Sequence, residues 1–147
     1  MIKLLLGLVC LLYFTSGIAQ KNTNEISEKF FTLYSKDPIL AMDYIASTNK
    51  WSEKMSDEIR DMKNKLKTLL DRIGDYKGHE LISERSTGQS VKIASYILKY
   101  DREPIRLILF FYKTSDTWRV QTYSFDESVG EELKDAVKSY SVSENDN

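Results

Sequence analysis

Apolar residues in the first half of the chain recur every three or four positions, which predicts helices. The first helix begins at a capping residue, Thr23 or Asn24, and the second at Asp37-Pro38, where a capping side chain precedes a proline. The third and longest helix begins at Ser56. The apolar stripes of these helices are Ile26, Phe30, Phe31 and Tyr34, then Ile39, Met42, Ile45 and Ala46, then Ile59, Met62, Leu66, Leu69, Leu70 and Ile73.

After Gly74, a residue typical of helix ends, the apolar period changes to two, which is the period of a strand. Four strands are expected at residues 78–85, 91–100, 105–112 and 118–125, with short turns between them. Strands joined by such turns pair antiparallel with their neighbours in sequence, as a meander. This order predicts an α+β fold in which N-terminal helices pack on a four-stranded antiparallel sheet.

A helical apolar stripe returns after the fourth strand. It predicts a C-terminal helix from a cap at Asp126 or Ser128 to about Tyr140, followed by a polar tail at 141–147 that we expect to be disordered. The stripe is formed by Val129, Leu133, Ala136, Val137 and Tyr140. Residues 20–140 are therefore expected to form a single α+β domain.

Residues 1–19 have the pattern of a secretory signal peptide. A start that contains Lys3 precedes the apolar run 4–14, and small residues follow at Gly17 and Ala19. The run is shorter than the roughly 20 residues that a membrane-spanning helix needs. We expect cleavage after Ala19, export to the periplasm or the medium, and no integral membrane segment in the processed protein.

Composition excludes several kinds of chemistry. The 21 Lys and Arg residues balance 22 Asp and Glu residues, so a strongly basic surface for nucleic acid is not expected. We expect the single cysteine, Cys10, to be removed with the signal peptide. The one histidine, His79, is then the sole remaining side chain of the Cys and His types that bind zinc. Because the sequence also contains no glycine-rich phosphate loop, we expect neither a metal nor a cofactor.

His79 has two interpretations. As a general base it would need a nucleophile or a carboxylate within hydrogen-bond reach. Its neighbour Glu80 points to the opposite face of a strand, and the sequence has no nucleophile elbow. We therefore favour an exposed histidine at the edge of the sheet and predict no catalytic residue.

The third predicted strand is apolar on both faces. Ile105, Leu107, Leu109 and Phe111 alternate with Ile108, Phe110 and Tyr112, and only Arg106 is polar. A strand of this kind is covered on both sides. We expect the first set to contact the helices and the second to contact the C-terminal helix, a second subunit or an apolar ligand.

The predicted binding residues surround that second set. In the fourth strand, alternation places Trp118, Val120 and Thr122 on one face and Arg119, Gln121 and Tyr123 on the other. We expect Tyr96, Leu98 and Tyr123 to join Ile108 and Phe110, with charged side chains at the rim. The candidate ligand or interface residues are Tyr96, Ile108, Phe110, Tyr112, Trp118, Tyr123, Arg106 and Arg119.

Three motifs resemble those of the nuclear transport factor 2-like, or cystatin-like cone, superfamily and in particular its small, uncharacterised exported bacterial members. They are IGDYKG at residues 73–78, LFFYK at 109–113 and the Trp-led strand WRVQTYSF at 118–125. The resemblance covers residues 25–126 and implies a sheet curved into a cone around a pocket or core. A helix after Asp126 departs from the simplest members of the superfamily, which end with the last strand.

Two functions follow as expectations. The first is an exported, non-catalytic binding or interaction module that uses an aromatic sheet face or the cone pocket, for a homodimer or a small apolar ligand. The second, implied by the resemblance, is a cofactor-free isomerase or dehydratase whose cone is a reaction pocket with buried Asp, Tyr and His residues. An open pocket with a buried carboxylate favours the second, and a cone filled by side chains favours the first.

Overall fold

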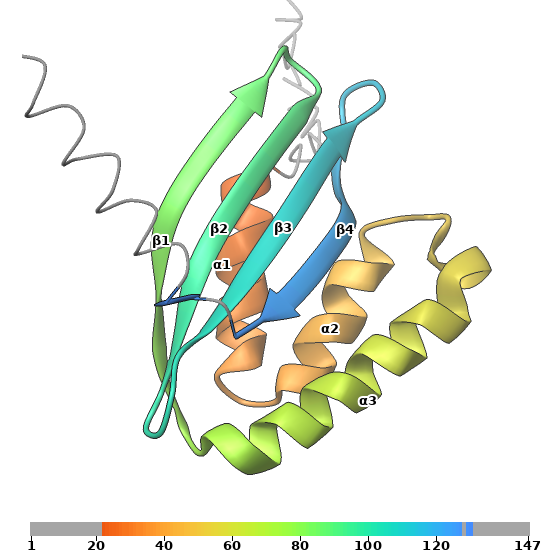
Figure 1. Ribbon diagram of the computed structural model, residues 1–147. Helices are drawn as coiled ribbons and strands as arrows, with labels where there is room; N and C mark the ends of the chain where they lie inside the picture. The colour runs from red at the N-terminus through yellow and green to blue at the C-terminus, as the bar shows by residue number, and fades with distance from the viewer. Residues whose placement is uncertain (1–21, 128, 131–147) are drawn as a thin grey trace, which may run out of the picture.

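The computed structural model describes residues 22–127 and 129–130, so the predicted signal peptide, most of the predicted C-terminal helix and the tail lie outside the described residues. The helices are α1 (Thr23–Tyr34), α2 (Pro38–Ser47), a short 3-10 helix η1 (Ser52–Met55) and α3 (Ser56–Ile73). The strands are β1 (Tyr76–Thr87), β2 (Val91–Tyr100), β3 (Ile105–Lys113) and β4 (Trp118–Asp126). Figure 1 shows their arrangement.

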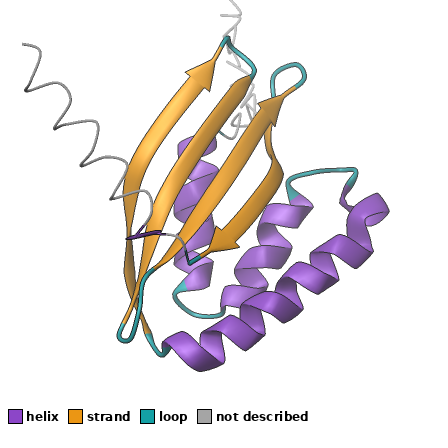
Figure 2. Ribbon diagram, in the orientation of Figure 1, coloured by secondary structure: helices purple, strands orange, loops and turns teal. Residues whose placement is uncertain are grey.

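The four strands form one antiparallel sheet in the order β1-β2-β3-β4, which confirms the predicted meander and the α+β fold. The helices precede the sheet in the chain, and α1 packs behind it in the view of Figures 1 and 2. We call the side of the sheet that packs against the helices the helix-facing side, and the opposite side the outer face.

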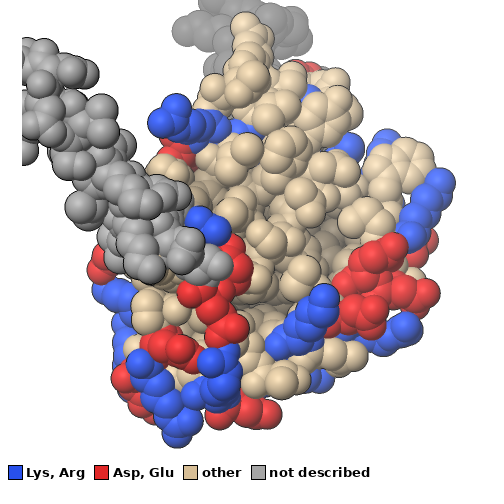
Figure 3. Space-filling model, in the orientation of Figure 1, with Lys and Arg blue, Asp and Glu red and all other residues tan. Residues whose placement is uncertain are grey.

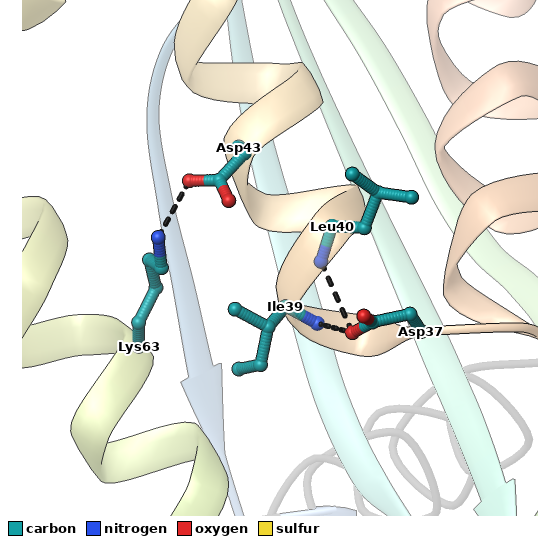
Figure 4. A network of polar contacts seen from close by, with 5 residues as sticks. All are labelled: Asp37, Ile39, Leu40, Asp43 and Lys63. Carbon is teal, nitrogen blue, oxygen red and sulfur yellow. Dashed lines mark hydrogen bonds and ion pairs between the residues drawn. The ribbon is translucent and has the colours of Figure 1, made fainter.

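The first two helices each begin at an N-cap side chain that is close to them in sequence. The Asn22 side chain accepts a hydrogen bond from the backbone N–H of Glu25 at 2.8 Å, so the cap lies one residue before the predicted Thr23. The Asp37 carboxylate accepts from the N–H groups of Ile39 and Leu40 at 2.8 and 3.2 Å, as Figure 4 shows, which confirms the predicted start of α2.

The end of α3 is tied to the turn between β2 and β3. Gly74 has a positive φ of 88°, and no space is left for a Cβ atom beside the Asp101 carboxylate. That carboxylate accepts a hydrogen bond from the N–H of Asp75 at 2.8 Å. The Arg102 guanidinium donates to the backbone oxygen of Arg72 at 3.0 Å, and its backbone N–H donates to the oxygen of Ile73 at 3.2 Å.

The helix-facing side of β3 is completely buried. Ile105, Leu107, Leu109 and Phe111 each have an exposed fraction of 0%, which confirms the prediction that this set contacts the helices. The rest of the core comes mainly from α1, α2 and β2 and includes Ile26, Phe30, Tyr34, Met42, Ile45 and Leu98. On the predicted apolar stripe of α3, Leu66 and Ile73 are buried and Leu70 is half-buried against the core.

Three register shifts, one in β4 and two in β1, the second of them between Leu81 and Ser83, change which side chains share a face. In β4 the pairing shifts between Val120 and Thr122, so Gln121 is an extra residue and alternation restarts after it. Thr122 therefore lies on the outer face and Tyr123 on the helix-facing side, which reverses the prediction for both residues. In β1 a similar shift leaves Lys77 as the extra residue between Tyr76 and Gly78.

Candidate functional site

The outer face consists of cross-strand rows fixed by the register. One row is Ile93, Phe110 and Thr122, and the next is Ser95, Ile108 and Ser124. Directly paired residues of an antiparallel sheet lie on the same face, so these rows form one continuous surface. Figure 3 shows a broad uncharged area there, with charged side chains gathered below and beside it.

Apolar side chains on this face are in contact with water in the described structure. Ile93 is 42% exposed, and Ile108, Phe110 and Tyr112 are partly exposed. By contrast, Ser95 is buried among its neighbours, and its hydroxyl has no hydrogen-bond partner among the described residues. The two rows therefore combine the apolar side chains of Ile93, Ile108 and Phe110 with the uncharged hydroxyls of Ser95, Thr122 and Ser124.

The two predicted rim arginines lie on this face and are held by neighbours. Arg106 donates from Nε to Oδ2 of Asp126 at 3.0 Å. Arg119 lies over the Tyr112 ring, with its guanidinium carbon 5.2 Å from the ring centre, and donates to Oε1 of Gln121 at 3.1 Å. The structure thus brings together five of the predicted site residues, namely Ile108, Phe110, Tyr112, Arg106 and Arg119.

Two of the other three predicted residues, Tyr96 and Tyr123, lie on the helix-facing side, so their assignment to the outer face was wrong, whereas Trp118 shares the face of Val120 as predicted. Tyr96 pairs with Leu107, is buried, and donates its hydroxyl hydrogen bond to Oγ of Ser27 at 3.0 Å. Tyr123 pairs with Leu109, and burial raises its pKa to about 12. Trp118 packs against the core and lies beneath the ammonium group of Lys113 at 5.1 Å. Leu98, expected beside them, is also buried in the core.

A group of aromatic residues between α1 and the start of the sheet was not predicted as a site. The hydroxyls of Tyr34 and Tyr100 form a buried hydrogen bond of 2.6 Å. Burial raises the pKa of Tyr34 far above its ordinary value and that of Tyr100 to about 12. The Tyr76 ring meets both of these rings edge to face, with centres 5.2 and 5.6 Å apart.

The extra residue Lys77 brings Tyr76 and His79 to the same side of β1. Three positions apart in a regular strand, they would point to opposite faces. The Tyr76 hydroxyl instead lies 2.9 Å from Nδ1 of His79, and the imidazole stacks on the Phe31 ring at 3.5 Å between centres. Burial, followed by the positive charge of Lys99, lowers the pKa of His79.

These residues border an open pocket of about 530 Å³ between α1 and β1. Its lining includes Glu28, Phe31, Thr32 and Ser35 from α1 and Tyr76 and His79 from β1. Gly78 completes the wall, with a φ of 128° that L side chains rarely adopt. An isolated glycine in a strand indicates a bulge, so Gly78 was the signal in the sequence for this site.

Several chemistries find little support within residues 22–127 and 129–130. No Asp or Glu of these ranges is buried, since the buried polar residues are Thr23, Ser27, Asn49 and Ser95. These ranges contain no group of three or more His, Cys, Asp or Glu side chains that could hold a metal ion. Among the described residues, no helix combines the length and the hydropathy that crossing a membrane requires.

Comparison of the chain with models of protein families, with curated proteins and with solved structures finds no match. The α+β fold therefore rests on the structure itself, and assignment to the cone superfamily remains a prediction.

Proposed function

We propose that the protein is an exported, non-catalytic interaction module that binds a second copy of itself through the outer face of its sheet. The observation that favours this is the partly exposed row formed by Ile93 and Phe110, with Ile108 beside it. Monomeric proteins seldom expose contiguous apolar patches larger than a few hundred Å². Contact between two such faces would remove these rows from water.

Charged pairs at one end of the outer face suit contact between two copies. Lys99 and Glu80 form an ion pair at 2.6 Å on β2 and β1, and Arg106 and Asp126 form another at 3.0 Å on β3 and β4. Both signs of charge thus border the apolar rows. A copy related by a two-fold axis can place acidic groups opposite basic ones, and such polar rims are common around interfaces.

Membership of the cone superfamily is part of the same proposal. The order of helices and strands agrees with it, and apolar side chains fill the space between α1 and the sheet. A cofactor-free isomerase or dehydratase would instead need a carboxylate in an apolar interior. The described residues contain no buried Asp or Glu, which favours the binding module over the enzyme.

Sedimentation equilibrium of the chain from residue 20 to 147 tests the self-association. We expect a concentration-dependent dimer, and Ile93→Lys should make it a monomer because a charge would be placed in the apolar row. Leu40→Lys is the matched control, since Leu40 is similarly exposed at 49% but lies on α2, and this variant should remain a dimer.

A monomer at every concentration, with a native circular dichroism spectrum, would contradict the dimer. A chain that ends at Gly130 then identifies the occupant of the face. If only this shorter chain dimerises, the segment 131–147 competes with a second copy for the outer face.

The export part of the proposal has a separate test. N-terminal sequencing of the protein from its native host should find a start near Gln20, outside the cell membrane. An intact Met1 in the membrane fraction would contradict cleavage and leave the outer-face proposal unaffected.

A further inference from the structure

We propose that the pocket between α1 and β1 binds a small organic cation, an amine attached to a flat apolar body, with its charge against Glu28 and its body on the exposed ring face of His79. This site is distinct from the outer face, because His79 pairs with Leu98 on the helix-facing side of the sheet. The proposal therefore does not depend on self-association.

The aromatic wall of the pocket is preorganised. His79 is stacked almost parallel to Phe31, at an interplanar angle of 7°, and its Nδ1 is held by the Tyr76 hydroxyl at 2.9 Å. Phe31 is itself fixed by an edge-to-face contact with Tyr96, with ring centres 4.8 Å apart. The imidazole is nevertheless exposed, so the face opposite Phe31 is available for stacking.

The backbone of β1 departs from regular geometry in order to make this wall. The extra residue at Lys77 and the positive φ of Gly78 both serve to bring Tyr76 and His79 onto one side. Bulges are frequent beside binding sites because they redirect a side chain.

The polar groups of the pocket are mainly hydrogen-bond acceptors. Glu28 is the one charged residue in the described lining, and its carboxylate has no ion-pair or hydrogen-bond partner among the described residues. The Thr32 and Ser35 hydroxyls donate to the backbone oxygens of Glu28 and Thr32 at 2.8 and 3.0 Å, so their remaining lone pairs are free to accept.

The carboxylate of Glu28 and the aromatic wall of His79 together favour a cationic ligand. An ammonium group gains a charge-assisted hydrogen bond to a carboxylate, and aromatic faces attract cations through their quadrupole. A carboxylate or phosphate ligand would be repelled by Glu28. Burial, followed by the positive charge of Lys99, lowers the pKa of His79 and so favours the neutral imidazole, which does not repel a cation.

Benzylamine, benzyl alcohol and benzoate are three probes of one shape with positive, zero and negative charge. Since His79 is the only histidine of the chain, its ring protons give an unambiguous nuclear magnetic resonance signal in an untagged protein. Titration at pH 7 should shift this signal saturably with benzylamine, about tenfold more weakly with benzyl alcohol, and not at all with benzoate.

Glu28→Gln should weaken benzylamine binding about tenfold and bring it to the affinity of benzyl alcohol. Glu53→Gln is the matched control, because Glu53 is an exposed glutamate on η1 away from the pocket lining, and it should bind as the unaltered protein does. Ile93→Lys should also bind normally, which separates this site from the outer face.

Two results would overturn the proposal. One is a His79 signal that responds to benzoate as strongly as to benzylamine. The other is a folded Glu28→Gln variant with undiminished affinity for benzylamine. Tyr76→Phe gives an additional test, because loss of the hydrogen bond to His79 should weaken the binding of both benzylamine and benzyl alcohol.

Discussion

The two sides of the sheet are built from the same strands but have opposite characters. On the helix-facing side, Leu107 and Leu109 are fully buried and the polar atoms of Tyr96 and Tyr100 are hydrogen-bonded. On the outer face, the intervening residues Ile108 and Phe110 are as apolar but remain partly exposed. Hydrophobicity alone therefore does not show which residues stabilise the fold, since alternation along β3 separates them from residues available for binding.

Leu109 and Ile108 provide the strongest test of this difference, because they are neighbours on opposite faces. Leu109→Ala should lower the free energy of unfolding by roughly 2–5 kcal/mol, since it leaves a cavity in a fully buried site. Ile108→Ala should cost about 1 kcal/mol, because the side chain is already partly in water. Urea titration of both variants measures the two losses, and equal values would contradict the assignment of faces.

Tyrosine hydroxyls extend the comparison to polar atoms. Tyr34→Phe removes the buried 2.6 Å hydrogen bond and leaves the Tyr100 hydroxyl without that partner. The expected loss is about 1–2 kcal/mol of unfolding free energy. Tyr112→Phe on the outer face should change the stability by less than about 0.5 kcal/mol, as surface substitutions usually do. Thermal or urea unfolding of the two variants measures both changes in stability.

Alkaline pH should destabilise the protein through its helix-facing side. Burial raises the pKa of Tyr76, Tyr100 and Tyr123 to about 12, whereas the unfolded chain loses these protons near pH 10. Above pH 10 the folded state therefore holds more protons than the unfolded state, and stability falls as the pH rises toward 12. Urea midpoints between pH 9 and pH 11 measure the fall, and a constant midpoint would contradict it.

The smallest expected effect is at acid pH and concerns His79. Its pKa in the folded protein lies below the ordinary 6.5, because burial and then Lys99 disfavour its charged form. As the pH falls below 6.5, the unfolded chain takes up this proton before the folded protein does, so stability decreases. Urea midpoints at pH 7 and 5.5 should differ less in His79→Gln than in the unaltered chain.

The sequence was sufficient for the order of elements and for the two faces of β3. Period and turn signals predicted the third helix and the meander, and β3 alternates without interruption, so its parity could be counted correctly. Counting alternate residues gave the wrong faces in the second half of β4, because a bulge at Gln121 adds one residue and reverses the face of every residue after it. Tyr123 was therefore assigned to the wrong face. No local signal in the sequence marks that bulge.

The position of Tyr96 and the pocket at His79 were not predicted correctly, for two different reasons. Tyr96 was misplaced because the register between β2 and β3 depends on how the strands pair, and the sequence of one strand does not fix it. The pocket beside His79 was missed because His79 was interpreted as an exposed residue at the edge of a regular strand, without the bulge at Lys77 that brings it beside Tyr76. The residues predicted from β3 itself, Ile108, Phe110 and Tyr112, were placed correctly.

The link between α3 and the β2–β3 turn has a consequence for the order of folding. The carbonyl groups of Arg72 and Ile73 bond to Arg102, and the N–H of Asp75 bonds to Asp101, residues that lie 26 to 30 positions away along the chain. The end of the helix therefore gains these bonds only after the hairpin has formed and closed this loop. Helical and strand halves are thus joined into one cooperative unit, and amide hydrogens in the last turn of α3 should exchange together with those of the hairpin.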